Sequence, residues 1–154
     1  MRRRRPERRI ILPDTKYNDL SVAKFINYIM ESGKKGVAEK IFYSAMELVR
    51  KKTKTDGIKI FKKGIENTSP SVEVKSRRIG GATYQVPIEV PKKRAFYLAS
   101  LWIINASKNS SGKPMSEKLA SELIAAANGD GNAIKKKEDT HRMADANKAF
   151  AHFR

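Results

Sequence analysis

Residues 72–90 read VEVKSRRIGGATYQVPIEV, two runs of alternating residues on either side of a Gly-Gly pair. Val72 and Val74 alternate with polar residues, and beyond Gly80 and Gly81 apolar residues alternate with polar ones again. A period of two is typical of β-strands, and a Gly-Gly pair between two such runs is typical of a tight turn. The stretch therefore predicts a β-hairpin. Because a single hairpin is only marginally stable, we expect its base to pack on other elements or on a partner.

On both sides of the hairpin, apolar residues recur every three or four positions, which is the spacing of one face of an α-helix. Three such segments begin near Asp19, Gly36 and Asp56, and three more begin near Pro91, Met115 and Gly131. The segment after Pro91 is apolar nearly all round, which predicts that it is the most buried helix and that Trp102 lies inside. The last segment places Met143, Ala146, Phe150 and Phe153 on one stripe.

The predicted fold is mainly α. It is a bundle of about six helices, with the β-hairpin protruding between the third and fourth helices. Residues 1–17 are predicted to form a basic N-terminal arm, since six arginines crowd around Pro6 and like charges this dense repel one another. Residues 18–154 are predicted to form a single helical domain that contains the hairpin, residues 72–90.

The charge points to a polyanionic partner. The 154 residues include 33 Lys and Arg against 16 Asp and Glu, a net charge of +17. Nucleic acid is the commonest partner of so basic a chain. A membrane surface is the rival, but the most apolar segment here is the least charged, whereas a membrane-surface helix has one strongly basic face. The chain has no cysteine, which excludes disulfides and thiolate metal sites.

The predicted hairpin carries the sharpest functional features. Arginine pairs bidentately with phosphate, glycine lets a ligand approach the backbone, and an aromatic ring such as that of Tyr84 stacks on a base. Pro87 cannot donate to the ladder, so we expect it at an outward-facing edge position. The alternative is that the charges only deter edge-to-edge pairing. The functional residues are Lys75, Arg77 and Arg78 before the turn, and Gly80, Gly81, Ala82, Thr83, Tyr84 and Gln85 at its tip.

Two other classes of function stay open. Glu138, His141 and Asp145 share one face of a predicted helix, and such a trio suits a metal-dependent RNA-processing enzyme. A hydrogen-bonded or RNA-contacting His141 is the better interpretation, because no cysteine and no other histidine except His152 accompanies it. A sequence-specific DNA-binding regulator would need a recognition helix with polar residues on its exposed face, and none of the predicted helices stands out that way.

Four blocks of the sequence resemble the small-subunit ribosomal protein S-seven family, in its bacterial or organellar form. The hairpin block and the C-terminal block are the most specific of the four. The blocks are LPD (12–14) with Tyr17, KFIN (24–27) and GKK (33–35); AEKI (38–41) with YSA (43–45); VEVKSRRIGGATYQVP (72–87); and KKEDTHRMA (136–144) with ANKAFAHFR (146–154).

The resemblance implies a structural constituent of the small ribosomal subunit, not an enzyme, with no cofactor and no metal. It implies direct binding to the head (3′ major) domain of the small-subunit rRNA, nucleation of head assembly, and contact with exit-site tRNA and mRNA through the hairpin. Expected partners are also neighbouring ribosomal proteins of head and platform, S-eleven among them, with neither a membrane nor a second copy of the chain. The expected location is the cytoplasm, or the matrix or stroma if the source is an organelle.

The residues expected to bind rRNA are cations of the arm, the hairpin, the helix ends and the loops. They are Arg2, Arg3, Arg4, Arg5, Arg8, Arg9, Lys34, Lys35, Lys75, Arg77, Arg78, Lys92, Lys93, Arg94, Lys113, Lys136, Lys137, Arg142 and Lys148.

Overall fold

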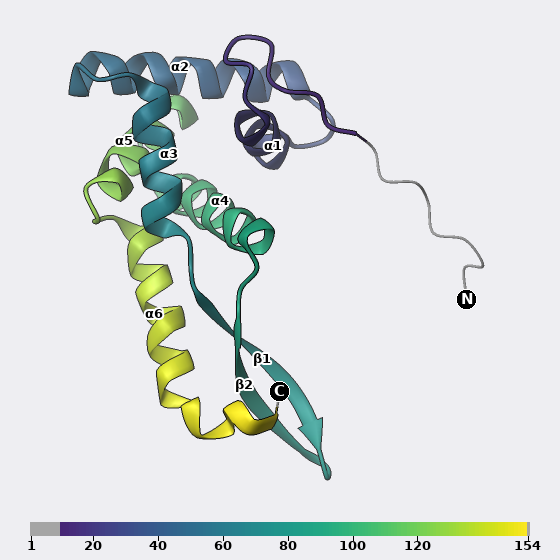
Figure 1. Ribbon diagram of the computed structural model, residues 1–154. Helices are drawn as coiled ribbons and strands as arrows, with labels where there is room; N and C mark the ends of the chain where they lie inside the picture. The colour runs from purple at the N-terminus through teal and green to yellow at the C-terminus, as the bar shows by residue number, and fades with distance from the viewer. Residues whose placement is uncertain (1–9, 154) are drawn as a thin grey trace. The chain divides into compact units, whose positions relative to one another are not determined.

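The computed structural model describes residues 10–153 (Figure 1). The chain divides into two compact units, Met1–Glu39 and Lys40–Arg154. The expectation that residues 18–154 form a single domain stays a prediction.

The first unit contains helix α1 (Leu20–Ile29) and the start of α2 (Lys35–Thr53). Asp19 caps α1, since its Oδ1 accepts a hydrogen bond from the backbone N–H of Ser21 at 2.7 Å. The predicted apolar stripe of α1 is buried, with Phe25 at its centre. Before the helix, the carboxylate of Asp14 accepts hydrogen bonds from two backbone N–H groups and holds a tight turn.

The second unit contains the rest of the helices and the hairpin. Its helices are α3 (Gly57–Thr68), α4 (Lys92–Asn109), α5 (Met115–Ala127) and α6 (Asn132–Ala146), followed by the 3₁₀-helix η1 (Lys148–Phe153). Helix α3 packs on α4 and α5, and α4 packs on α5 and α6. Over the described residues there are six α-helices, with the hairpin between α3 and α4, which confirms the predicted fold.

Strands β1 (Val72–Ile79) and β2 (Ala82–Glu89) form a two-stranded antiparallel sheet in which Ile79 pairs with Ala82. Gly80 and Gly81 form the turn, with φ of 56° and 89°. Two successive positive φ values match a type I′ turn, whose twist fits that of the strands and which glycine adopts without strain. The hairpin is therefore the one that the alternation and the Gly-Gly pair predict.

The hairpin does not stand alone. Helix α6 packs against β1, and η1 packs against β2 (Figure 1), which confirms that the hairpin packs on other elements of the chain. Val86 is fully buried by this packing. Pro87 is buried too, because the base of the hairpin packs into the fold. Its expected outward-facing edge position in the ladder stays a prediction.

The predicted last helix is interrupted. Helix α6 ends at Ala146, and the backbone N–H and the side-chain amide of Asn147 both donate to the carbonyl oxygen of Met143. The chain turns there into η1, so Met143 and Phe150 do not share one helical stripe, and Met143 is 49% exposed. A side chain that competes for helix carbonyls is a common reason for a helix to end.

Helix α4 differs from its prediction in a similar way. Its buried residues lie on one side, including Ala99, Ile103 and Ala106. Trp102 is only half-buried, contrary to expectation. The face of α4 that packs on α3, α5 and α6 could not be predicted from the sequence, because apolar residues lie on all sides of this helix.

Close packing at the start of α3 yields a first prediction. A Cβ added at Gly57 would lie 2.8 Å from the backbone oxygen of Met46 in α2. We expect Gly57→Ala to lower the free energy of unfolding by about 1–3 kcal/mol, because two backbones would have to separate. Thermal and urea denaturation measure this loss.

Gly36→Ala is the matched control, since a Cβ there would meet nothing within 4 Å and Gly36 lies in α2. Its stability should be unchanged or higher, because alanine favours a helix. Equal stability of the two variants would contradict the close approach at Gly57.

Candidate nucleic-acid interface

The outer half of the hairpin presents its polar side chains to solvent. Arg77, Arg78, Thr83 and Gln85 are all exposed, as expected of a binding element. Tyr84 is half-buried, because its ring packs against that of Phe150 with the centroids 5.3 Å apart. The ring predicted to stack on a base is thus already in contact with another ring of the chain.

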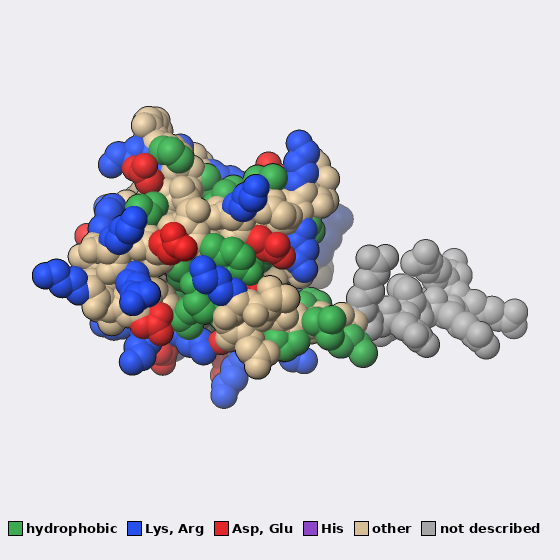
Figure 2. Space-filling view, turned by 90° about the horizontal axis from the view of Figure 1, so that it is seen from above, with side chains coloured by type: hydrophobic (Ala, Val, Ile, Leu, Met, Phe, Trp, Pro, Cys, Tyr) green, Lys and Arg blue, Asp and Glu red, His purple; other side chains and the backbone are tan. Residues whose placement is uncertain are grey.

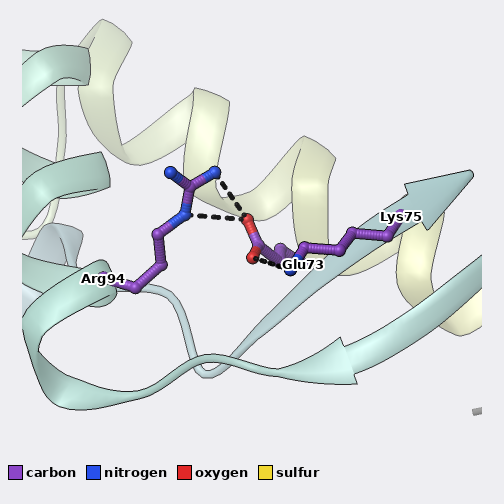
Figure 3. A network of polar contacts seen from close by, with 3 residues as sticks. All are labelled: Glu73, Lys75 and Arg94. Atoms are coloured by element: carbon purple, nitrogen blue, oxygen red, sulfur yellow. Dashed lines mark hydrogen bonds and ion pairs between the residues drawn. The ribbon is translucent and has the colours of Figure 1, made fainter. Parts of the chain in front are cut away.

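The base of the hairpin holds a network around a buried carboxylate (Figure 3). Glu73 is 8% exposed. Its Oε2 accepts hydrogen bonds from Nε and Nη2 of Arg94 at 3.3 and 3.2 Å, and its Oε1 lies 3.8 Å from Nζ of Lys75. A buried carboxylate is stable only when it is paired in this way.

This network positions two of the predicted RNA-binding cations. The side chains of Arg94 and Lys75 remain 46% and 60% exposed, and a guanidinium has five N–H donors, of which Glu73 occupies two. Both cations can therefore meet a phosphate while Glu73 holds their charged groups in place. Sequence reasoning missed Glu73, since its pairing with a residue 21 positions away depends on how the hairpin meets α4.

Helix α4 begins with three exposed cations, Lys92, Lys93 and Arg94, and has no acidic residue in its first turn. Helix α2 begins in the same way with Lys35, directly after Lys34. The N-terminal end of a helix carries a partial positive charge, so each cation there destabilises the helix by some tenths of a kcal/mol, and an anion stabilises it. Both helix starts are therefore well suited to bind phosphate.

The cations of α6 and its surroundings divide into two kinds. Lys137 is engaged inside the chain, since its Nζ donates to the backbone oxygen of Asn67 at 2.6 Å and satisfies the C-terminal end of α3. Arg142 lies 3.8 Å from Asp139 in an exposed ion pair of little energetic weight. Lys113, Lys136 and Lys148 are exposed.

His141 ties α6 to the hairpin. Its Nε2 accepts a hydrogen bond from the backbone N–H of Ser71 at 3.2 Å, just before β1. Burial lowers the pKa of His141 and so does the charge of Lys137, whereas Asp145 opposes them. The neutral ring that accepts from Ser71 is thus favoured, which makes His141 a structural histidine.

The described residues hold no group of three His, Asp or Glu side chains that could bind a metal ion. The trio of Glu138, His141 and Asp145 is therefore not assembled as the enzyme hypothesis requires. Within residues 10–153, no helix has the length and the apolar character needed to cross a membrane.

The predicted cations do not all gather in one place. In the second unit, Lys75 and Arg94 meet at Glu73, and Lys92 and Lys93 precede Arg94 in the first turn of α4. Lys34 and Lys35 belong to the first unit. On the face drawn in Figure 2, Lys and Arg side chains are dispersed, with Asp and Glu among them. The six predicted arginines of the arm, Arg2, Arg3, Arg4, Arg5, Arg8 and Arg9, lie outside the described residues.

Comparison with known proteins identifies the family. The family model described as "Ribosomal protein S7p/S5e" matches residues 1–148. "Small ribosomal subunit protein uS7" of Thermotoga maritima is 56% identical over 154 residues, which cover 100% of this chain and 99% of the relative. The protein of that name from an Anaeromyxobacter strain is 58% identical over 153 residues, 99% of this chain and 98% of the relative. The chain therefore belongs to the ribosomal protein S7p/S5e family, whose members are structural proteins of the small ribosomal subunit and not enzymes.

Proposed function

We propose that the chain binds the head (3′ major) domain of the small-subunit rRNA directly, nucleates head assembly, and contacts exit-site tRNA and mRNA through its hairpin. The observation that carries this proposal is the placement of exposed cations on the hairpin and at the starts of α2 and α4. These cations belong to a chain whose residues 1–148 match the model of a ribosomal protein family.

Two physical effects supply the binding. Each lysine or arginine that neutralises a phosphate releases condensed counterions, which gives affinity without regard to sequence. The helices and the hairpin supply shape, because folded RNA is recognised largely through its backbone and its unpaired regions. Glu73 adds to this by holding Arg94 and Lys75 in place before RNA arrives.

The proposed binding also implies where the chain acts and which proteins lie beside it. The chain acts in the cytoplasm as one copy in each small subunit, beside other ribosomal proteins of head and platform, including S-eleven. It needs no cofactor. The arginines of residues 1–9 add further phosphate contacts.

A double substitution on the hairpin tests this proposal. We expect Arg77→Ala with Arg78→Ala to weaken binding to a head-domain transcript by at least about tenfold, since a hydrogen bond to a charged group contributes about 1.5–3 kcal/mol. The melting temperature should stay within about 2 °C of that of the parent protein, because both side chains are exposed.

Lys51→Ala with Lys52→Ala is the matched control. Both lysines are exposed at the end of α2, and the change in net charge is the same. If the control lost as much affinity as the hairpin variant, net charge rather than the hairpin would explain binding. A large drop in melting temperature of the hairpin variant would show that the two arginines stabilise the fold.

A further inference from the structure

The register of the hairpin gives it two faces. Residues that pair directly across an antiparallel ladder point to the same side, and neighbours along a strand point to opposite sides. Arg77 pairs with Tyr84 and Arg78 with Thr83. The two adjacent arginines therefore lie on opposite faces. We name the face of Arg77 the covered face; it also holds Lys75, Ala82, Tyr84 and Val86. We name the face of Arg78 the open face; in the outer half of the hairpin it also holds Ser76, Thr83 and Gln85.

The covered face is occupied by the chain itself. Phe150 of η1 packs on Tyr84, directly opposite Arg77 in the ladder, and Val86 is fully buried. Nearer the base, Glu73 lies on the same face and is bound to Arg94 of α4. Figure 1 shows η1 crossing the hairpin at the end of α6.

The open face is polar over the whole outer half of the hairpin. All four of its residues are exposed. The hydroxyl of Ser76 donates to Oε1 of Gln85 at 3.2 Å across the strands, which holds the amide in place with its nitrogen available to donate. The guanidinium of Arg78 and the hydroxyl of Thr83 are further donors. The carboxylate that shares this face, that of Glu89, lies at the far end of the ladder, where it pairs with Val72.

This chemistry fits the sugar-phosphate backbone of RNA. Arginine pairs with phosphate, and hydroxyl and amide groups bond to phosphate or to the ribose 2′-hydroxyl. An apolar peptide would find no apolar side chain among the four residues. A flat base would find no aromatic ring there, because the ring of Tyr84 lies on the covered face.

We infer that the hairpin binds RNA backbone through its open face, so that Arg78 holds a phosphate while its neighbour Arg77 does not. Thr83 and Gln85 contact the same strand of RNA. This inference rests on the proposed function and names the face that performs it. Phe150 acts as a positioning residue, since it covers one face and thereby leaves the other to the partner.

The test compares single variants of the full chain that differ only in the face they change. Arg78→Ala should weaken RNA binding about tenfold, and Arg77→Ala by less than about twofold to threefold. Binding is measured with a head-domain transcript and, in a second arm, with deacylated tRNA. Comparing the two RNAs shows whether the open face binds the backbone of rRNA or that of tRNA. Both are run near 0.15 M salt, where charges farther apart than about 8 Å are largely screened.

A second pair adds a charge instead of removing one. Thr83→Glu places a carboxylate on the open face, and Ala82→Glu places one beside it on the covered face; both positions are exposed. We expect Thr83→Glu to weaken binding at least as much as Arg78→Ala does, and Ala82→Glu to have the smaller effect. Circular dichroism and melting temperature check that all four variants fold.

The outcomes separate the two proposals. Equal losses within each pair, or a larger loss for Arg77→Ala and Ala82→Glu, would overturn the inference about the face. In that case binding of the parent protein to the head-domain transcript would still support the proposed function. A parent protein that does not prefer the head-domain transcript to unrelated RNA would refute the proposed function itself.

Discussion

Replacing Phe61 by alanine is expected to lower the free energy of unfolding by about 3–5 kcal/mol. Phe61 is 1% exposed, and its ring meets the edge of the Phe42 ring at a centroid distance of 5.4 Å and an angle of 87°. The substitution removes this aromatic pair and leaves a cavity between α2 and α3. A domain of this size is stable by about 5–15 kcal/mol, so the loss is a large share of the total.

Urea denaturation followed by circular dichroism measures the loss. Met143→Ala is the control, because Met143 is 49% exposed and its removal leaves no buried cavity. Its effect should stay below about 1 kcal/mol. A Phe61→Ala variant as stable as the Met143→Ala variant would show that the Phe42–Phe61 contact is not part of a packed core.

The affinity for head-domain RNA is expected to fall by at least about a thousandfold between 50 and 200 mM salt, as for a protein that contacts six or more phosphates. The exposed cations of the hairpin, the start of α4 and α6 supply enough positive groups for that number. Fluorescence anisotropy across a salt series gives the slope of log affinity against log salt.

A double variant calibrates this slope. Lys92→Ala with Lys93→Ala removes two exposed cations from the start of α4 and should reduce the slope by about one for each phosphate that the variant no longer neutralises. A slope near zero in the parent protein would contradict a binding mode built on phosphate contacts. An unchanged slope in the variant would remove the start of α4 from the interface.

The features that the sequence predicts correctly are local ones. The Gly-Gly turn depends only on φ at two neighbouring positions. The alternation of apolar and polar residues depends only on the pleat of each β-strand, which turns successive side chains to opposite faces. The predicted start of a helix near Asp19 depends on a hydrogen bond to a backbone group only two residues away. Such features form from the residues that encode them, so a pattern in one sequence is sufficient.

The features that the sequence did not predict depend on how distant elements meet. Glu73 pairs with Arg94 because the hairpin returns to the start of α4, and Phe150 meets Tyr84 because α6 ends early. Pro87 is buried for the same reason as Val86, which is packing at the base of the hairpin. No spacing in the sequence encodes these contacts.

The candidate interface shows both kinds of feature. The alternation of the strands already separates Arg77 from Arg78, since neighbours in a strand face opposite sides. Which of the two faces remains open depends on η1, and η1 follows from the end of α6 at Asn147. Lys137 shows that a cation in the sequence need not face a partner, because its ammonium group serves the end of α3.

Competition binding tests whether the chain prefers the head domain of the small-subunit rRNA to other nucleic acids. The parent protein is titrated into a labelled transcript of the small-subunit head domain, with unrelated structured RNA or duplex DNA of equal phosphate content as competitor. We expect binding to the head domain to survive an excess of either competitor. Equal displacement by unrelated RNA would leave only a generic basic protein, and preferential displacement by duplex DNA would favour a DNA-binding regulator.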